Sequence, residues 1–128
     1  MDEVADTETA DGERWRRCYE RLQEIRAYEF DWNDEGANPP GLEVTGLAEA
    51  VLLNLQTNNQ RPPDSFFATD EGHVILSWEK EGHYFEIEVD AMLQCTGRSI
   101  PPSALRAASN KIHQSDLAQI SIPIHYSI

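Results

Sequence analysis

Residues 73–89 read HVILSWEKEGHYFEIEV, and they carry the clearest strand pattern in the chain. Apolar and polar side chains alternate over His73 to Trp78 and again over His83 to Val89, on either side of a polar loop from Glu79 to Gly82. Such alternation is typical of strands with one buried face, and a glycine in the loop supplies the positive φ that hairpins need. The stretch therefore predicts a β-hairpin.

One face of this hairpin is apolar throughout when Trp78 is paired with His83, because Leu76 then lies opposite Phe85. The other face is mixed and acidic. Its side chains are those of His73, Ile75, Ser77, Tyr84, Glu86 and Glu88, with Asp90 just beyond. An isolated hairpin is marginal in water, so we expect a third strand over Ala91 to Cys95.

Two amphipathic helices are predicted before the hairpin. Apolar side chains recur at three- and four-residue steps in two segments. They are Trp15, Cys18, Leu22 and Ile25 in the first segment, and Val44, Leu47, Ala48, Val51, Leu52 and Leu55 in the second. The polar run from Gln56 to Gln60 and the pair Pro62-Pro63 end the second helix. The pattern predicts an α+β fold in which both helices pack on a small antiparallel sheet, a β-meander, in a core domain over residues 14–95.

The two ends of the chain differ from this core. Residues 1–13 hold six acids, no base and only small apolar side chains, so they predict a mobile acidic tail. Residues 96–128 form a C-terminal extension with a short helix from Ala104 to about His113 and a late strand over 120–128, where apolar residues alternate strictly. Such a strand must pair with its own sheet or with a second copy, and we favour a homodimer formed through it.

Turn-forming residues gather around a tryptophan in residues 31–41, which read DWNDEGANPPG. They predict an ordered loop. We assign structural roles to Trp32, Gly36, Pro39, Gly72 and Trp78, and we expect both tryptophans to be buried in the core. Asp31, Asn33, Glu35 and Gly36 imitate only the start of a calcium-binding loop.

The charge balance sets limits on the partners of the chain. The formal net charge is −13, which repels phosphate backbones and anionic lipid headgroups, so we expect no direct binding to nucleic acid or membranes. A basic protein is the favoured partner. The absence of a signal-type segment, and of an apolar run of roughly 20 residues, predicts a cytoplasmic protein. Cys18 and Cys95 are expected to be free, buried thiols.

Catalytic signatures are missing from the sequence. The histidines have no zinc-type spacing, no serine lies in a nucleophile-elbow context, and no glycine-rich phosphate loop is present. The sequence therefore predicts no catalytic residue, no metal and no cofactor, although it leaves enzymatic activity open.

Residues 22–89 resemble a group of small, mostly uncharacterised bacterial domains. The shared pattern is a tryptophan before Gly-Ala-x-Pro, a helix, a proline break, and Asp-x-Gly followed by a strand that ends in tryptophan. Here the pattern is formed by Trp32, residues 36–39, the helix through Leu55, Pro62-Pro63, and residues 70–78. The resemblance implies no activity.

Three functions remain open from the sequence. The first is a non-enzymatic interaction or accessory protein of immunity, antitoxin or chaperone-like type, which uses an acidic surface and a sheet edge. Its candidate binding residues are Tyr84, Glu86, Glu88 and Asp90. The second is a small metal-dependent hydrolase that uses Asp70, His73, Glu86 and Glu88. The third is an acidic mimic of nucleic acid.

Overall fold

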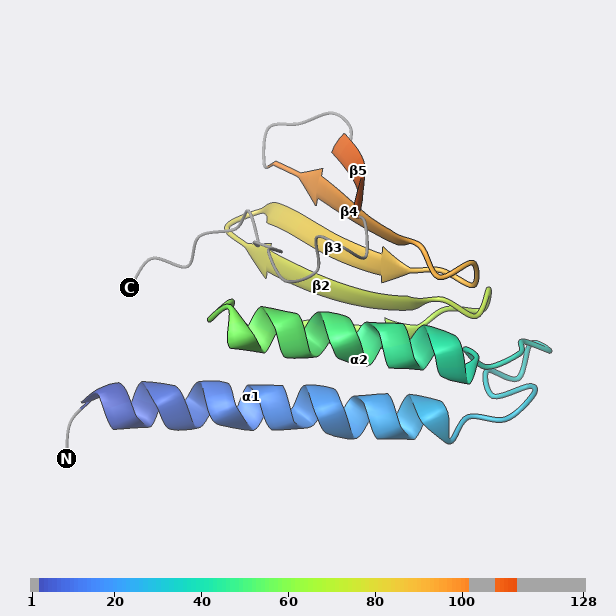
Figure 1. Ribbon diagram of the computed structural model, residues 1–128, viewed down its shortest axis with the longest axis horizontal. Helices are drawn as coiled ribbons and strands as arrows, with labels where there is room; N and C mark the ends of the chain where they lie inside the picture. The colour runs from blue at the N-terminus through green and yellow to red at the C-terminus, as the bar shows by residue number, and fades with distance from the viewer. Residues whose placement is uncertain (1–2, 102–107, 113–128) are drawn as a thin grey trace.

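A computed structural model describes residues 3–101 and 108–112. Two helices are followed by five strands (Figure 1). They are α1 (Glu3–Arg26), α2 (Leu42–Thr57), β1 (Ser65–Ala68), β2 (Val74–Lys80), β3 (His83–Val89), β4 (Cys95–Ile100) and β5 (Ala108–Ile112). Each strand pairs antiparallel with the next, in the order β1-β2-β3-β4-β5. The predicted α+β fold, with two helices and an antiparallel meander, is confirmed.

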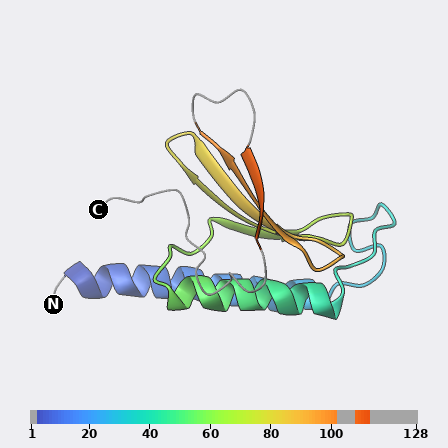
Figure 2. The same cartoon turned by 45° about the horizontal axis from the view of Figure 1, so that its top comes forward.

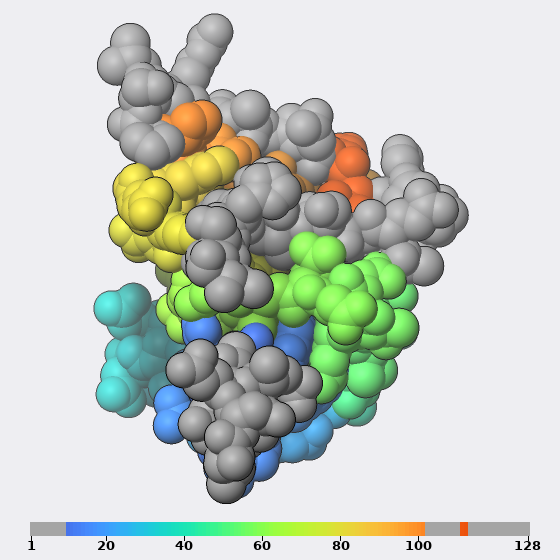
Figure 3. Space-filling view, turned by 90° about the vertical axis from the view of Figure 1, so that its left-hand side faces the viewer, coloured from blue at the N-terminus to red at the C-terminus, as the bar shows by residue number. Residues whose placement is uncertain are grey.

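Both helices lie side by side on the same side of the sheet (Figures 1 and 2). Seen from the end where α1 begins, α1 (blue) lies at the bottom, the chain around residue 60 (green) above it, and the sheet (yellow to orange) at the top (Figure 3). The core fills the space between the layers. It contains the predicted helix stripes and the apolar faces of the strands, including Leu22, Ile25, Leu52, Leu55, Leu76 and Ile87.

Trp78 lies at the centre of this core with no exposed surface, as predicted. Its ring packs against Phe85 with the centroids 5.7 Å apart, and its Nε1 donates a 2.9 Å hydrogen bond to the main-chain oxygen of Arg61. A buried indole thus has both its apolar body and its single donor satisfied.

Trp32 differs from this prediction, because it lies outside the core. The ring is half-buried, stacks on Tyr28 at 4.8 Å between centroids, and donates from Nε1 to the main-chain oxygen of Asn38 at 3.2 Å. The loop that carries it runs beyond the end of the two layers, so the tryptophan packs on its own loop and on the end of α1. Gly36, with φ of 80°, provides the left-handed turn there.

The first helix is longer than predicted. It begins at Glu3, whereas the apolar pattern predicted a helix only from about Trp15; the mobility expected for residues 1–13 stays a prediction. The physical reason is that a helix nucleated by a packed segment extends by one hydrogen bond per added residue, and acidic residues near its N-terminus are favoured by the helix dipole.

The hairpin register also differs, by two residues. Trp78 pairs with Phe85, not with His83, and Lys80 pairs with His83 across a two-residue turn formed by Glu81 and Gly82. Both turn residues have positive φ, 52° and 82°, which is the geometry that two-residue hairpins prefer. A shift by two residues keeps every side chain on its predicted face, so the apolar pattern alone does not distinguish the two registers.

Three further elements depart from the predictions. The third strand of the hairpin sheet is β4, which begins at Cys95, while Ala91–Leu93 form the turn. The edge strand β1 was not predicted, because it is only four residues long and lies between the prolines and the next turn. Residues 108–112 form β5 where a helix was expected, since pairing with β4 overrides the weak helix propensity around Ser109 and Asn110.

The remaining predictions concern the two cysteines, the C-terminal strand and membrane-spanning segments. Cys18 and Cys95 are free and buried, as expected. The strand over 120–128, and the homodimer based on it, lie outside the described residues and stay predictions. In the part of the chain that the structure describes, no helix is both long and apolar enough to cross a membrane.

Candidate functional site

The face of the sheet that is turned away from the helices carries three of the four predicted binding residues. We call it the outer face; its described side chains include Ile75, Ser77, Tyr84, Glu86, Glu88, Thr96 and Arg98. Alternation along each strand places them there, opposite the core residues. Strand pairing brings Glu86 next to Ser77 on one side and next to Arg98 on the other.

A continuous chain of polar contacts crosses this face. Arg98 Nη1 lies 2.7 Å from Glu86 Oε2, and its Nη2 lies 2.8 Å from Glu88 Oε1. At one end of the chain, His73 Nδ1 lies 2.7 Å from Glu88 Oε2. At the other end, the Tyr84 hydroxyl donates to Glu86 Oε1 at 2.8 Å. One guanidinium therefore bridges two carboxylates, and each carboxylate has a second partner.

The pKa values of this network follow from burial and from these contacts. Burial acts to raise the pKa of Glu88, but hydrogen bonds from His73 and Arg98 outweigh it and leave the pKa below its usual value. Burial, together with the neighbouring Glu86 carboxylate, raises the pKa of the Tyr84 hydroxyl to about 12. At neutral pH the network therefore holds Glu88 as a charged carboxylate, Arg98 as a cation and Tyr84 as a neutral phenol.

The polar network of Arg98, Glu86 and Glu88 occupies the place where the hydrolase hypothesis needs a metal ion. Arg98 lies between Glu86 and Glu88, at the position that a divalent cation shared by the two carboxylates would need. Asp70, which that hypothesis also uses, lies exposed in the turn between β1 and β2. Among the side chains that the structure describes, those of residues 10–101 and 111–112, no group of three or more histidine, cysteine or acidic residues is arranged to hold a metal.

Asp90, the fourth predicted binding residue, stabilises a turn. Its Oδ1 accepts hydrogen bonds from the main-chain nitrogens of Met92 (2.9 Å) and Gln94 (3.0 Å), in the connection from β3 to β4. Leu93 in that turn has φ of 62°. The structure therefore separates Asp90 from the other three residues.

A second surface lies at the end of the molecule where three connections meet, on the right in Figure 1. These are the loop before α2, the turn between β1 and β2, and the turn between β3 and β4. They enclose a groove of about 580 Å³, which we call the loop-end groove. Its lining residues are Asn38, Pro39, Gly41, Leu42, Glu43, Val44, Glu71, Gly72, Ala91 and Leu93.

Turn geometry brings these connections together. Gly72 has φ of 80°, and a Cβ on it would lie 4.0 Å from the main-chain oxygen of Pro39. Gly72 and Pro39, to which the sequence analysis assigned structural roles, thus lie on one wall of the groove. Thr69 fixes the same turn, because its hydroxyl accepts from the main-chain nitrogens of Glu71 and His73.

The loop-end groove combines exposed apolar side chains with acids. Leu42, which lines the groove, is 78% exposed, and Met92, which lies between the lining residues Ala91 and Leu93, is 81% exposed. Glu43 and Glu71 line the groove, and no lysine or arginine is among its described lining residues. The surface therefore combines exposed apolar side chains with acids.

Comparisons with known proteins leave the family open. No family model, no curated protein and no solved structure matches the chain.

The loop-end groove was not predicted from the sequence as a site. Its residues come from three segments that are far apart in the chain, and only the fold brings them together. The available signals were the turn residues themselves, together with the apolar residues Leu42 at the start of α2 and Met92 in the turn before β4.

Proposed function

We propose that the protein is a non-enzymatic interaction module that binds a basic protein partner in the loop-end groove. The single observation that carries the proposal is that exposed Leu42 lines one cavity together with Glu43 and Glu71. The exposed Met92 lies between two further lining residues, Ala91 and Leu93. An apolar centre with a charged rim is the usual anatomy of a protein–protein interface. The partner is expected to insert an apolar side chain that is flanked by lysine or arginine.

The rigidity of the three connections supports this assignment. Asp90 and Thr69 hold two of them through paired hydrogen bonds to main-chain nitrogens. In the third, Asn33 Oδ1 accepts from the main-chain nitrogens of Glu35 and Ala37. A binding surface that is already formed loses little conformational entropy when the partner docks.

The outer face is a weaker choice for the acidic surface that the sequence suggested. Glu86 and Glu88 are only 14% and 17% exposed, and Arg98 bridges them. Their charge is thus compensated within the chain. The same compensation interrupts the continuous acidic stripe that a nucleic-acid mimic needs. The uncompensated acids at the loop end complement a basic protein.

Calorimetric titration with two synthetic peptides tests the proposal. The first peptide has two central leucines flanked by lysines, and the second has serines in place of the leucines. We expect the leucine peptide to bind and the serine peptide to bind at least tenfold more weakly, because only the first fills the apolar centre. Equal binding of both peptides contradicts the proposal, because it would show attraction to the net charge alone.

A matched pair of charge reversals locates the interaction. Glu71 and Glu81 are both exposed acids in tight turns, at opposite ends of the same sheet. We expect Glu71→Lys to lower the affinity for the leucine peptide about tenfold, which is about 1.4 kcal/mol of binding free energy. Glu81→Lys should leave this affinity nearly unchanged. Equal effects of the two variants contradict a localised site.

A further inference from the structure

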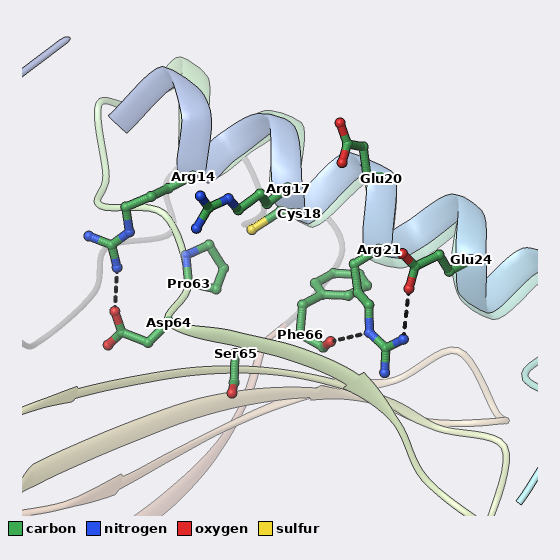
Figure 4. A pocket seen from close by; sticks show the side chains of 10 residues that line it. All are labelled: Arg14, Arg17, Cys18, Glu20, Arg21, Glu24, Pro63, Asp64, Ser65 and Phe66. Carbon is green, nitrogen blue, oxygen red and sulfur yellow. Dashed lines mark hydrogen bonds and ion pairs between the residues drawn. The ribbon is translucent and has the colours of Figure 1, made fainter. Parts of the chain in front are cut away.

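A second groove runs between α1 and the free edge of the sheet (Figure 4). Its volume is about 330 Å³, and we call it the edge groove. Arg14, Arg17 and Arg21 of α1 line one side, with Asp64, Ser65 and Phe66 along the other. Cys18 and Pro63 are both buried beneath it. The groove thus has an apolar floor, a helix side on which Glu20 and Glu24 accompany the three arginines, and a strand edge.

The strand edge is the first requirement for binding an extended peptide. β1 is the terminal strand of the described sheet, so no strand of residues 3–101 or 108–112 lies on the other side of its main chain. Main-chain groups point alternately toward and away from the paired strand. The nitrogen of Thr69 bonds to His73 beside β2, so Phe67 also faces β2, while Phe66 and Ala68 face the free edge.

Arg21 already occupies this edge. Its Nε donates a 3.2 Å hydrogen bond to the main-chain oxygen of Phe66. The same guanidinium bonds to Glu24 at 3.0 Å and to the hydroxyl of Tyr28 at 2.8 Å. A side chain that covers an edge carbonyl blocks unwanted strand pairing, and it can be displaced by a peptide whose own amide takes over the bond.

Arg17 provides a charge for which the described part of the chain has no ion-pair partner. Arg14 pairs with Asp64, and Arg16 on the exposed side of α1 pairs with Glu13 and Glu20. Arg17 lies between Arg14 and Arg21 on the groove side, and its side chain is exposed. Two acids of α1 also line the groove, but Glu20 pairs with Arg16 and Glu24 pairs with Arg21. Among the described lining residues, Arg17 is therefore the charged side chain left without an ion pair.

We infer that the edge groove binds an extended peptide segment, which adds to β1 as a further antiparallel or parallel strand and places an acidic side chain against Arg17. Main-chain hydrogen bonds to Phe66 and Ala68 provide affinity, and the carboxylate at Arg17 provides selectivity. Arg21 releases the carbonyl of Phe66 when the peptide binds. This site is separate from the loop-end groove and takes a partner of opposite charge.

Peptide binding measured by fluorescence anisotropy tests the inference. The probe is a labelled seven-residue peptide of alternating valine and threonine with a central aspartate, and its partner has asparagine at the centre. We expect the aspartate peptide to bind about tenfold more tightly. Equal affinity, or tighter binding of a version with a central lysine, overturns the inference.

Two further experiments distinguish strand addition from electrostatic attraction alone. In the aspartate peptide, alternate main-chain N–H groups point toward β1 and away from it. N-methylation of the set that faces β1 should abolish binding, while N-methylation of the other set should leave binding unchanged. Equal binding by both methylated peptides overturns strand addition. Arg17→Glu should remove the preference for the aspartate peptide over the asparagine peptide, while the matched variant Arg16→Glu should keep it. If Arg17→Glu keeps this preference and Arg16→Glu removes it, the role of Arg17 is overturned.

A second copy of this chain is the competing occupant. Sedimentation of the unliganded protein distinguishes it from a separate partner. A monomer that binds the aspartate peptide supports the inference. A dimer that the same peptide dissociates shows that another copy fills the groove, and this result overturns the inference of a separate partner.

Discussion

The guanidinium of Arg98 lies 2.8 Å from the carboxylate of Glu88 on the outer face of the sheet. Glu86 contacts the same guanidinium at 2.7 Å, so removal of the arginine leaves two neighbouring carboxylates without their shared cation. We expect Arg98→Met to lower the free energy of unfolding by about 1 to 2 kcal/mol at neutral pH. Urea denaturation measures this loss. Arg16→Met, on the exposed face of α1, should cost less than about 0.5 kcal/mol.

The pH dependence of stability follows from Glu88. Its pKa in the folded protein is lowered by His73 and Arg98, so the folded state favours the charged carboxylate. This contribution is present above the unfolded pKa, about 4.3, and is lost as the pH falls through the lower folded pKa. We expect Glu88→Gln to be less stable than the wild type at pH 6. Urea denaturation near pH 3 should show a smaller difference; a difference that grows on acidification contradicts the assignment.

The two tryptophans should respond differently to truncation. Trp78 is fully buried, so Trp78→Ala should cost about 3 to 5 kcal/mol or prevent folding. Trp32 stacks only on Tyr28 and lies outside the core, so Trp32→Ala should cost about 1 kcal/mol. Thermal unfolding of both variants checks the order. Equal losses would show that the loop is part of the core.

The hairpin and both helix stripes were predictable because alternation and three- and four-residue spacing report burial directly. The register was not, since a shift by two residues leaves Trp78 and Phe85 on the same face. β5 was missed because its pairing with β4 depends on a distant segment. Tyr84, Glu86 and Glu88 were correctly placed on one face, but their compensation by Arg98 needed the meander to bring β4 beside β3.

Asp90 distinguishes a structural role from a binding role. Its carboxylate accepts from two main-chain nitrogens, so Asp90→Ala should cost about 1 kcal/mol, while Asp90→Asn keeps an acceptor and should cost less. Chemical denaturation provides the measurement. If Asp90→Asn is as damaging as the alanine variant, the charge of Asp90 contributes beyond these two bonds.

The cysteines should react slowly in the folded protein. Burial raises the pKa of both thiols to about 11, and both side chains are almost fully covered. Only the thiolate is nucleophilic, so a thiol reagent at pH 8 should label Cys18 and Cys95 rapidly only after denaturation in urea. Mass spectrometry after a short labelling pulse identifies any site that reacts early. Rapid labelling without denaturant would contradict the burial of that thiol.

The proposed function is tested most directly by mapping backbone amide shifts in NMR spectra while the leucine–lysine peptide is added. We expect the largest shifts at residues 41–44, 71–72 and 91–93, the three segments that line the loop-end groove. The serine–lysine peptide should cause only small shifts at the same concentration. Shifts that spread evenly over the acidic surface, or that leave these three segments unchanged, would contradict the account.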